Sequence, residues 1–335
     1  MARYVPLGHR ISLRLGRVLD AVTHFPPYKW SEDVLRRLGF TGRSVVIAIP
    51  WIWLLLFFLI PFIIVLKISF AETRLGVPPY TPLLEFAADG RAHFAKLNVQ
   101  NYLFIFKESL YLEAFLSSLK VAAVSTIFCL LLGYPMAYGI ARANASWRNI
   151  LLLLIILPFW TSFLVRVYAW IGLLRNNGLI NNVLMGLGII DEPIVMMQTD
   201  FAMYIGIVYS YLPFMILPLY SNLEKHDNTL LEAAVDLGAT PFRAFLKVTL
   251  PLSVPGIIAG SMLVFIPAVG EFVIPRLLGG PDSLMIGRVL WDEFFLNRNW
   301  PMASAVAISL LLVLVIPIMV FQRFQEQESG AGAHK

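Results

Sequence analysis

Long apolar stretches, separated by shorter polar segments, dominate the chain from residue 45 onward. Several of them are about 20 residues long, the length that an α-helix needs to cross a hydrocarbon core of about 30 Å. Because lipid offers no partner to backbone N–H and C=O groups, each span is expected to be a helix. The pattern predicts an all-α integral membrane protein with six transmembrane helices, at 45–70, 114–141, 150–174, 200–222, 253–276 and 302–322.

The predicted spans divide the rest of the chain into a leader, connecting loops and a tail. The leader, 1–44, is basic, and it is either an amphipathic helix on the membrane surface or a segment that only sets topology. The loop 71–113 is too short for a substantial core of its own. Residues 114–322 form a five-helix core with a polar loop at 224–252, and the tail, 323–335, is expected to lack order.

The composition and the distribution of charge support this topology. Hydrophobic residues make up 58% of the chain and charged residues only 14%, whereas a soluble domain contains about a quarter charged residues. The net charge of +5 does not indicate a nucleic-acid partner, because the basic residues gather in the leader and in two loops between spans. An excess of Lys and Arg marks cytoplasmic segments, so both termini and these two loops are predicted to be cytoplasmic. The loops at 71–113, 175–199 and 277–301 then face outward, with Arg175 and Arg288 as exceptions to the rule.

The chain carries no motif for catalysis, nucleotide binding or metal binding that we recognise. It lacks a G-x-x-x-x-G-K-[ST] phosphate loop and the patterns H-E-x-x-H, C-x-x-C and G-x-S-x-G. Its single cysteine, Cys129, lies in the second predicted span, and its five histidines are scattered. We therefore predict a protein that is not an enzyme, binds no cofactor or metal, and depends on a partner for any energy used to move a solute.

The polar loop 224–252 has the pattern of two short helices separated by a break. Residues 227–229 can cap a helix, and Gly238 can adopt the left-handed backbone that ends one. Thr240 and Pro241 are typical of the start of a second helix. The pattern predicts a rigid helical projection at the cytoplasmic surface, with an ordinary amphipathic loop as the alternative.

The sequence of this loop resembles the EAA loop of ABC-importer permeases, whose pattern is E-A-A-x3-G-x9-I-x-L-P. The run from Glu232 to Gly238 reads E-A-A-V-D-L-G, and V-T-L-P follows at the required spacing, with Val248 in the Ile position. The resemblance implies that the loop docks into a cleft on an ATPase subunit dimer, which binds and uses the ATP. The residues that it implies for ATPase coupling are Glu232, Ala233, Ala234, Gly238, Leu250 and Pro251.

Four further stretches resemble the permeases of bacterial putrescine/spermidine ABC importers: 155–170, 176–178, 260–275 and 277–287. This resemblance implies a type I ABC-importer permease fold in the bacterial inner membrane and a polyamine cargo. It also implies three kinds of partner, namely an ABC ATPase dimer, a second related permease and a periplasmic polyamine-binding protein. Two alternatives remain: an ABC importer for another small solute, and, from a different class, an autonomous channel or secondary carrier.

Three charged residues lie away from the ends of the predicted spans, where a charge is costly and indicates either a structural pair or a function: Lys120, Arg166 and Glu271. In the structural interpretation, Glu271 pairs with Arg166 or Lys120 and holds the helices together. In the functional interpretation, Glu271 lines the substrate path and attracts a cationic solute. Aromatic side chains can assist by cation–π attraction, and the candidates for the path are Trp160, Tyr168, Tyr209 and Tyr211.

Overall fold

The computed structural model of the chain describes residues 42–82, 84–86, 92–94, 97–227, 229–281 and 283–332. The interpretations of the leader before residue 42 and of Asn228 as a helix cap lie outside these residues. The chain divides into two compact units, 1–65 and 66–335. The described part of the first unit is one apolar helical run. It comprises α3 (Gly42–Leu54), the π-helical turn η1 (Leu55–Leu59) and the beginning of α4 (Ile60–Ser69).

Helices also make up most of the described second unit. In chain order they are α5 (Gln100–Lys107), α6 (Ser109–Arg142), α7 (Ala145–Ile156), the 3-10 turn η2 (Leu157–Trp160), α8 (Phe163–Leu174), α9 (Leu179–Gly186), α10 (Asp200–Leu223), α11 (Thr229–Asp236), α12 (Pro241–Ala244), the π-helical turn η3 (Phe245–Thr249), α13 (Leu250–Leu252), α14 (Val254–Val269), α15 (Val273–Leu277), α16 (Ile286–Trp291), the π-helical turn η4 (Asp292–Leu296) and α17 (Trp300–Gly332). Strand structure in the described residues is a short antiparallel hairpin of β1 (Leu84–Phe86) and β2 (Ala92–Phe94).

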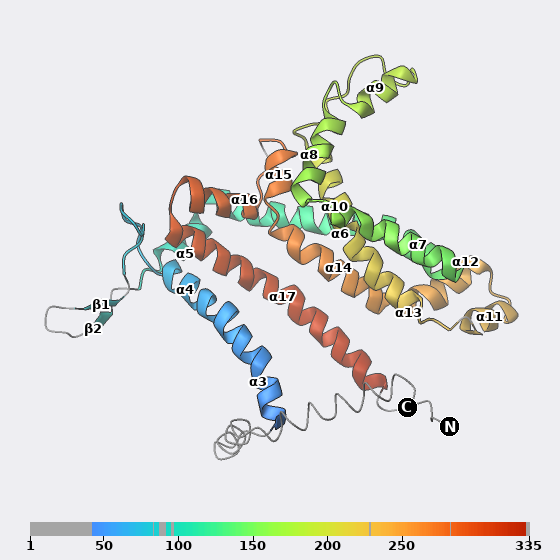
Figure 1. Ribbon diagram of the computed structural model, residues 1–335, viewed down its shortest axis with the longest axis horizontal. Coiled ribbons are helices and arrows are strands. Elements are labelled where there is room, and N and C mark those ends of the chain that lie inside the picture. The colour runs from blue at the N-terminus through green and yellow to red at the C-terminus, as the bar shows by residue number, and fades with distance from the viewer. Residues whose placement is uncertain are drawn as a thin grey trace, which may run out of the picture. The chain divides into compact units, whose positions relative to one another are not determined.

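The core of the second unit is built from α6, α10 and α14, which pack side by side (Figure 1). Met215 of α10 is fully buried between two glycines of the neighbouring helices. A Cβ at Gly133 of α6 would lie 3.0 Å from Met215 Cγ, and one at Gly260 of α14 would lie 2.8 Å from Met215 Sδ. Small residues at these crossings let the helices approach closely, which is how membrane helices gain packing energy.

Four helices are long and apolar enough to cross a membrane, or up to six spans exist in the described residues if each of two bent pairs counts as one. The four are Val46–Ser69, Ser109–Arg142, Asp200–Leu223 and Trp300–Met319. They correspond to the first, second, fourth and sixth predicted spans, which are confirmed as helices. The bent pairs correspond to the third and fifth.

The third predicted span, 150–174, is bent rather than straight. The helical runs Ala145–Trp160 and Phe163–Gly186 meet at 92°, and Figure 1 shows α8 and α9 turning away from the line of α7. Pro158 has no N–H to donate to the preceding turn, and Thr161 is extended, with φ −92° and ψ 152°. The first helix therefore ends at Trp160, and a new one begins at Phe163.

The fifth predicted span, 253–276, also differs from a straight helix. The run Pro241–Leu252 meets α14 at 62°, next to Pro255, which cannot donate a backbone hydrogen bond across the bend. At its other end, α14 stops at Val269, and α15 starts only at Val273. The fifth predicted span is therefore interrupted between residues 269 and 273, beside Pro267, Gly270 and Pro275, which disfavour a continuous helix.

The last helix continues beyond its predicted end. The sixth span was expected to stop at residue 322 and to be followed by a tail without order, but α17 runs to Gly332. Glu and Gln residues after Arg323 are good helix formers, so the helix propagates past the apolar segment.

Candidate functional site

The polar loop 224–252 has the helix–break–helix form that its sequence predicts, and it is called the coupling loop below after its predicted role. At its start, Asp227 Oδ1 accepts a hydrogen bond from the backbone N–H of Thr229, at 2.9 Å. This hydrogen bond holds the pKa of the Asp227 carboxyl below its ordinary value. At the second helix, Thr240 Oγ1 accepts from the backbone N–H of Arg243, at 3.4 Å, and Pro241 is the first residue of α12.

Gly238 makes the break between α11 and α12. Its φ is +84°, in the left-handed region that favours glycine. The N–H of Gly238 donates to Val235 O at 2.8 Å, and the N–H of Ala239 donates to Ala234 O at 3.0 Å. These two bonds form the Schellman motif, which satisfies the last carbonyls of α11 and redirects the chain into α12.

The coupling loop presents apolar side chains at its surface. Leu237 is 89% exposed and Phe242 is 70% exposed. Of the six residues predicted to contact an ATPase, four are exposed and two are half-buried; the exposed residues are Glu232, Ala233, Gly238 and Pro251, and the half-buried ones are Ala234 and Leu250. Exposed apolar groups on a short, capped helical projection form a surface suited to a protein partner.

Glu271 lies at the break between α14 and α15 and is buried, with 8% of its surface exposed. Its Oε1 accepts hydrogen bonds from the first backbone N–H groups around α15, at Phe272 (3.1 Å), Val273 (2.9 Å) and Ile274 (3.4 Å). In a continuous helix these donors would bond to carbonyls one turn earlier, so the carboxylate replaces that part of the helix and stabilises the break.

The other carboxylate oxygen of Glu271 connects α15 to α10. Oε2 accepts a hydrogen bond from the Tyr211 hydroxyl at 2.5 Å. The structure therefore brings together two of the residues predicted for the substrate path. The sequence contained a signal for this arrangement, because Pro267, Gly270 and Pro275 flank Glu271 and weaken helix continuity.

The ion pair predicted between Glu271 and Arg166 or Lys120 is not formed, and within the described ranges Glu271 has no basic partner at ion-pair distance. Arg166 Nη1 instead donates to Pro158 O at 2.5 Å, and its guanidinium lies over the rings of Phe159 and Phe163, at 5.0 and 5.9 Å. The 92° bend accounts for this, since it folds the start of α8 back over η2. Lys120 is exposed on α6.

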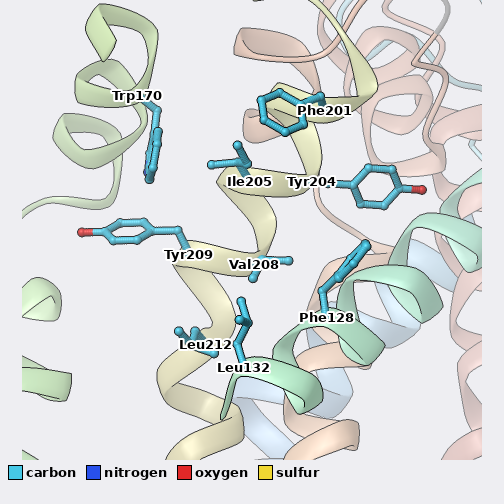
Figure 2. A pocket seen from close by; sticks show the side chains of 9 residues that line it. All are labelled: Phe128, Leu132, Trp170, Phe201, Tyr204, Ile205, Val208, Tyr209 and Leu212. Carbon is cyan, nitrogen blue, oxygen red and sulfur yellow. The ribbon is translucent and has the colours of Figure 1, made fainter. Parts of the chain in front are cut away.

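The remaining aromatic candidates lie elsewhere. Trp160 is 73% exposed and Tyr168 is 59% exposed, and neither contacts Glu271 among the described contacts. Tyr209 packs edge-on against Trp170, with ring centroids 5.4 Å apart. Figure 2 shows both on the wall of a separate apolar groove of about 560 Å³, which Phe128 and Tyr204 also line. The lining side chains of this groove are all uncharged.

Comparison with known proteins connects these features to one family. The family model for the binding-protein-dependent transport system inner membrane component matches residues 129–328. The chain is similar to the spermidine/putrescine transport system permease protein PotB of Haemophilus influenzae, with 43% identity over 282 residues, which cover 84% of this chain and 93% of that protein. The protein of the same name from Escherichia coli K12 is 41% identical over 273 residues, which cover 81% and 93%.

A solved structure has the same fold. It is a crystal structure of a bacterial alginate ABC transporter in complex with an alginate pentasaccharide-bound periplasmic protein. One of its chains superposes with a TM-score of 0.65 at 15% identity, covering 88% of this chain and 96% of that chain. Together with the family match, this likeness confirms the predicted fold class, that of an ABC-importer membrane subunit.

Proposed function

The chain belongs to the family of binding-protein-dependent transport system inner membrane components, and on that premise we propose that it is the permease subunit of an ATP-driven polyamine importer. The observation that carries the proposal is the 43% identity, over most of both chains, to a spermidine/putrescine permease. The capped and exposed coupling loop supports it, because a permease without its own nucleotide site needs a surface through which ATP use is transmitted.

The proposed partners follow from this role. The coupling loop docks on one subunit of an ABC ATPase dimer, which binds the ATP. A second related permease completes the translocation path, and a periplasmic polyamine-binding protein delivers the substrate. The proposed topology places both termini in the cytoplasm, because this puts the basic leader and the coupling loop on the ATPase side of the inner membrane.

We place Glu271 in the substrate path. Its carboxylate is buried, and its hydrogen-bond partners are neutral: three backbone N–H groups and the Tyr211 hydroxyl. No basic side chain in the described residues neutralises its negative charge, which is therefore available to attract an ammonium group. Trp160, Tyr168 and Tyr209 remain predictions as path residues, and Tyr209 would act from the separate groove in Figure 2.

The test is uptake of labelled putrescine and spermidine, each by itself, in cells that lack their own polyamine importers. The cells express the chain with its neighbouring ATPase, permease and binding-protein subunits, and a parallel strain carries Gly238→Val. We expect uptake that requires the chain and is lost in the variant. Assembly with the ATPase but no polyamine uptake would refute the cargo and favour an importer of another small solute. Failure to retain any ATPase on purification would favour an autonomous channel or secondary carrier.

A further inference from the structure

At its beginning, the coupling loop is hydrogen-bonded to the membrane helices through one arginine. Arg148, in the first turn of α7, donates from Nη1 to Glu224 Oε1 at 2.8 Å, directly after the end of α10. Its Nη2 faces the carbonyl oxygens of Ala141 and Ala143, at 3.3 and 3.4 Å, where α6 ends. A single guanidinium therefore joins the end of α6, the start of α7 and the first residue of the coupling loop.

At its end, the coupling loop contacts α6 through a buried tyrosine. The Tyr134 hydroxyl of α6 lies 2.8 Å from Ser253 Oγ, and Ser253 Oγ itself donates to Leu250 O at 2.9 Å. Because the serine has one proton to give, the tyrosine must be the donor in the first bond. The Tyr134 ring also packs edge-on against Phe245 of η3, with centroids 5.7 Å apart. Both hydrogen-bonding side chains are buried, and Ser253 sits at the 62° bend.

Both sets of contacts involve the same helix, α6. Tyr134 lies two turns before the end of α6, and the Arg148 contacts are at that end. Helix α6 continues from there through the core, packed on α10 and α14. A displacement of the coupling loop that moves Glu224 or Ser253 must therefore either carry the cytoplasmic end of α6 with it or break these contacts.

We propose that Arg148 and Tyr134 are positioning residues, which transmit movement of the coupling loop to α6. This inference rests on the proposed function. It goes beyond that function because neither residue belongs to the EAA pattern. The Arg148–Glu224 pair is partly exposed, and such pairs add little to folding stability. Its loss is therefore expected to impair coupling and leave the folded complex intact.

The test uses the purified complex of permeases and ATPase in proteoliposomes with the binding protein. Labelled spermidine uptake and ATP hydrolysis are measured in the same vesicles. For Arg148→Glu, which places two carboxylates together, we expect uptake per ATP hydrolysed to fall about fivefold or more, with normal amounts of complex. Adding Glu224→Arg restores an ion pair, so the double variant should transport better than Arg148→Glu alone. Arg175→Glu, the same change at an exposed arginine of an outer loop, is the matched control.

The second attachment is tested by removing only the hydroxyl groups. Tyr134→Phe keeps the ring against Phe245, and Ser253→Ala removes the acceptor. We expect each to lower uptake per ATP about two- to fivefold. Ser253→Ala also removes the bond to Leu250 O, so the double variant should lose no more than Ser253→Ala alone, because the Tyr134–Ser253 bond is already absent in that variant.

The outcomes separate this inference from the function on which it rests. Unchanged uptake per ATP in Arg148→Glu and Tyr134→Phe, beside an active wild-type complex, overturns the inference alone. A parallel fall of complex amount, ATP hydrolysis and uptake, without recovery in the double charge variant, assigns these residues a purely structural role and also overturns it. A wild-type complex without ATP-dependent uptake overturns the proposed function and the inference together.

Discussion

The backbone of Gly238 offers a quantitative test of the coupling loop. Its φ of +84° belongs to the left-handed region, and no atom beyond its two chain neighbours lies within 4 Å of the position that a Cβ would occupy. Within this chain the cost of a side chain there is therefore backbone strain, not collision. For alanine that strain is about 1–2 kcal/mol, and for β-branched valine it is larger. Asparagine adopts the left-handed conformation more readily, so Gly238→Asn should retain most of the Schellman motif.

A strain of 1–2 kcal/mol changes the ratio of two backbone states by about five- to thirtyfold. We expect uptake per ATP hydrolysed to decrease in the order Gly, Asn, Ala, Val, with normal amounts of protein in the membrane. Protection of the 229–239 segment against hydrogen exchange should fall in the same order, because the N–H groups of residues 238 and 239 form the hydrogen bonds of the Schellman motif.

Asparagine is larger than alanine, so the order of these two variants separates strain from size. If Gly238→Asn couples worse than Gly238→Ala, crowding against a partner decides the effect and the reasoning from φ is refuted. Equal activity of Gly238→Ala and the wild type would refute it as well, because the strained position would then have no influence on coupling.

Three further predictions address other parts of the molecule. Glu271→Gln keeps the shape of the side chain and an acceptor for the α15 backbone but removes the charge, so membrane insertion should be normal and polyamine uptake should fall about tenfold. Poor insertion, measured by the amount of protein in the membrane, would instead assign Glu271 a structural role. Glu232→Lys reverses a favourable charge in the first turn of α11, which should destabilise that helix by about 0.3–1 kcal/mol. The variant should leave the complex assembled but uncouple ATP hydrolysis from uptake. Normal transport would contradict the proposed role of the loop. Gly260→Val forces a side chain against Met215 and should destabilise the protein by about 1–3 kcal/mol in thermal unfolding. Adding Met215→Ala should recover part of this loss. No change in melting temperature would show that α10 and α14 are not closely packed there.

The local features of the coupling loop could be predicted because each depends on neighbouring residues. Asp227, Thr240 and Pro241 act on the backbone within three positions, and Gly238 makes the break with its own φ. The surroundings of Glu271 could be predicted only in part. The flanking proline and glycine residues indicated a distorted helix, but they did not show that the carboxylate itself would accept the N–H groups of the break.

By itself, the sequence determined which segments are apolar enough to span a membrane, where the polar loop begins and breaks, and which family pattern that loop follows. Only the tertiary structure decided that Glu271 bonds to Tyr211 and not to Arg166, and that Arg148 and Tyr134 hold the two ends of the coupling loop. Tyr134 and Ser253 are 119 residues apart in sequence, and Arg148 and Glu224 are 76 apart. Hydropathy and capping act over a few neighbouring residues, whereas these bonds depend on how bent helices meet in space, which no short segment of the chain encodes by itself.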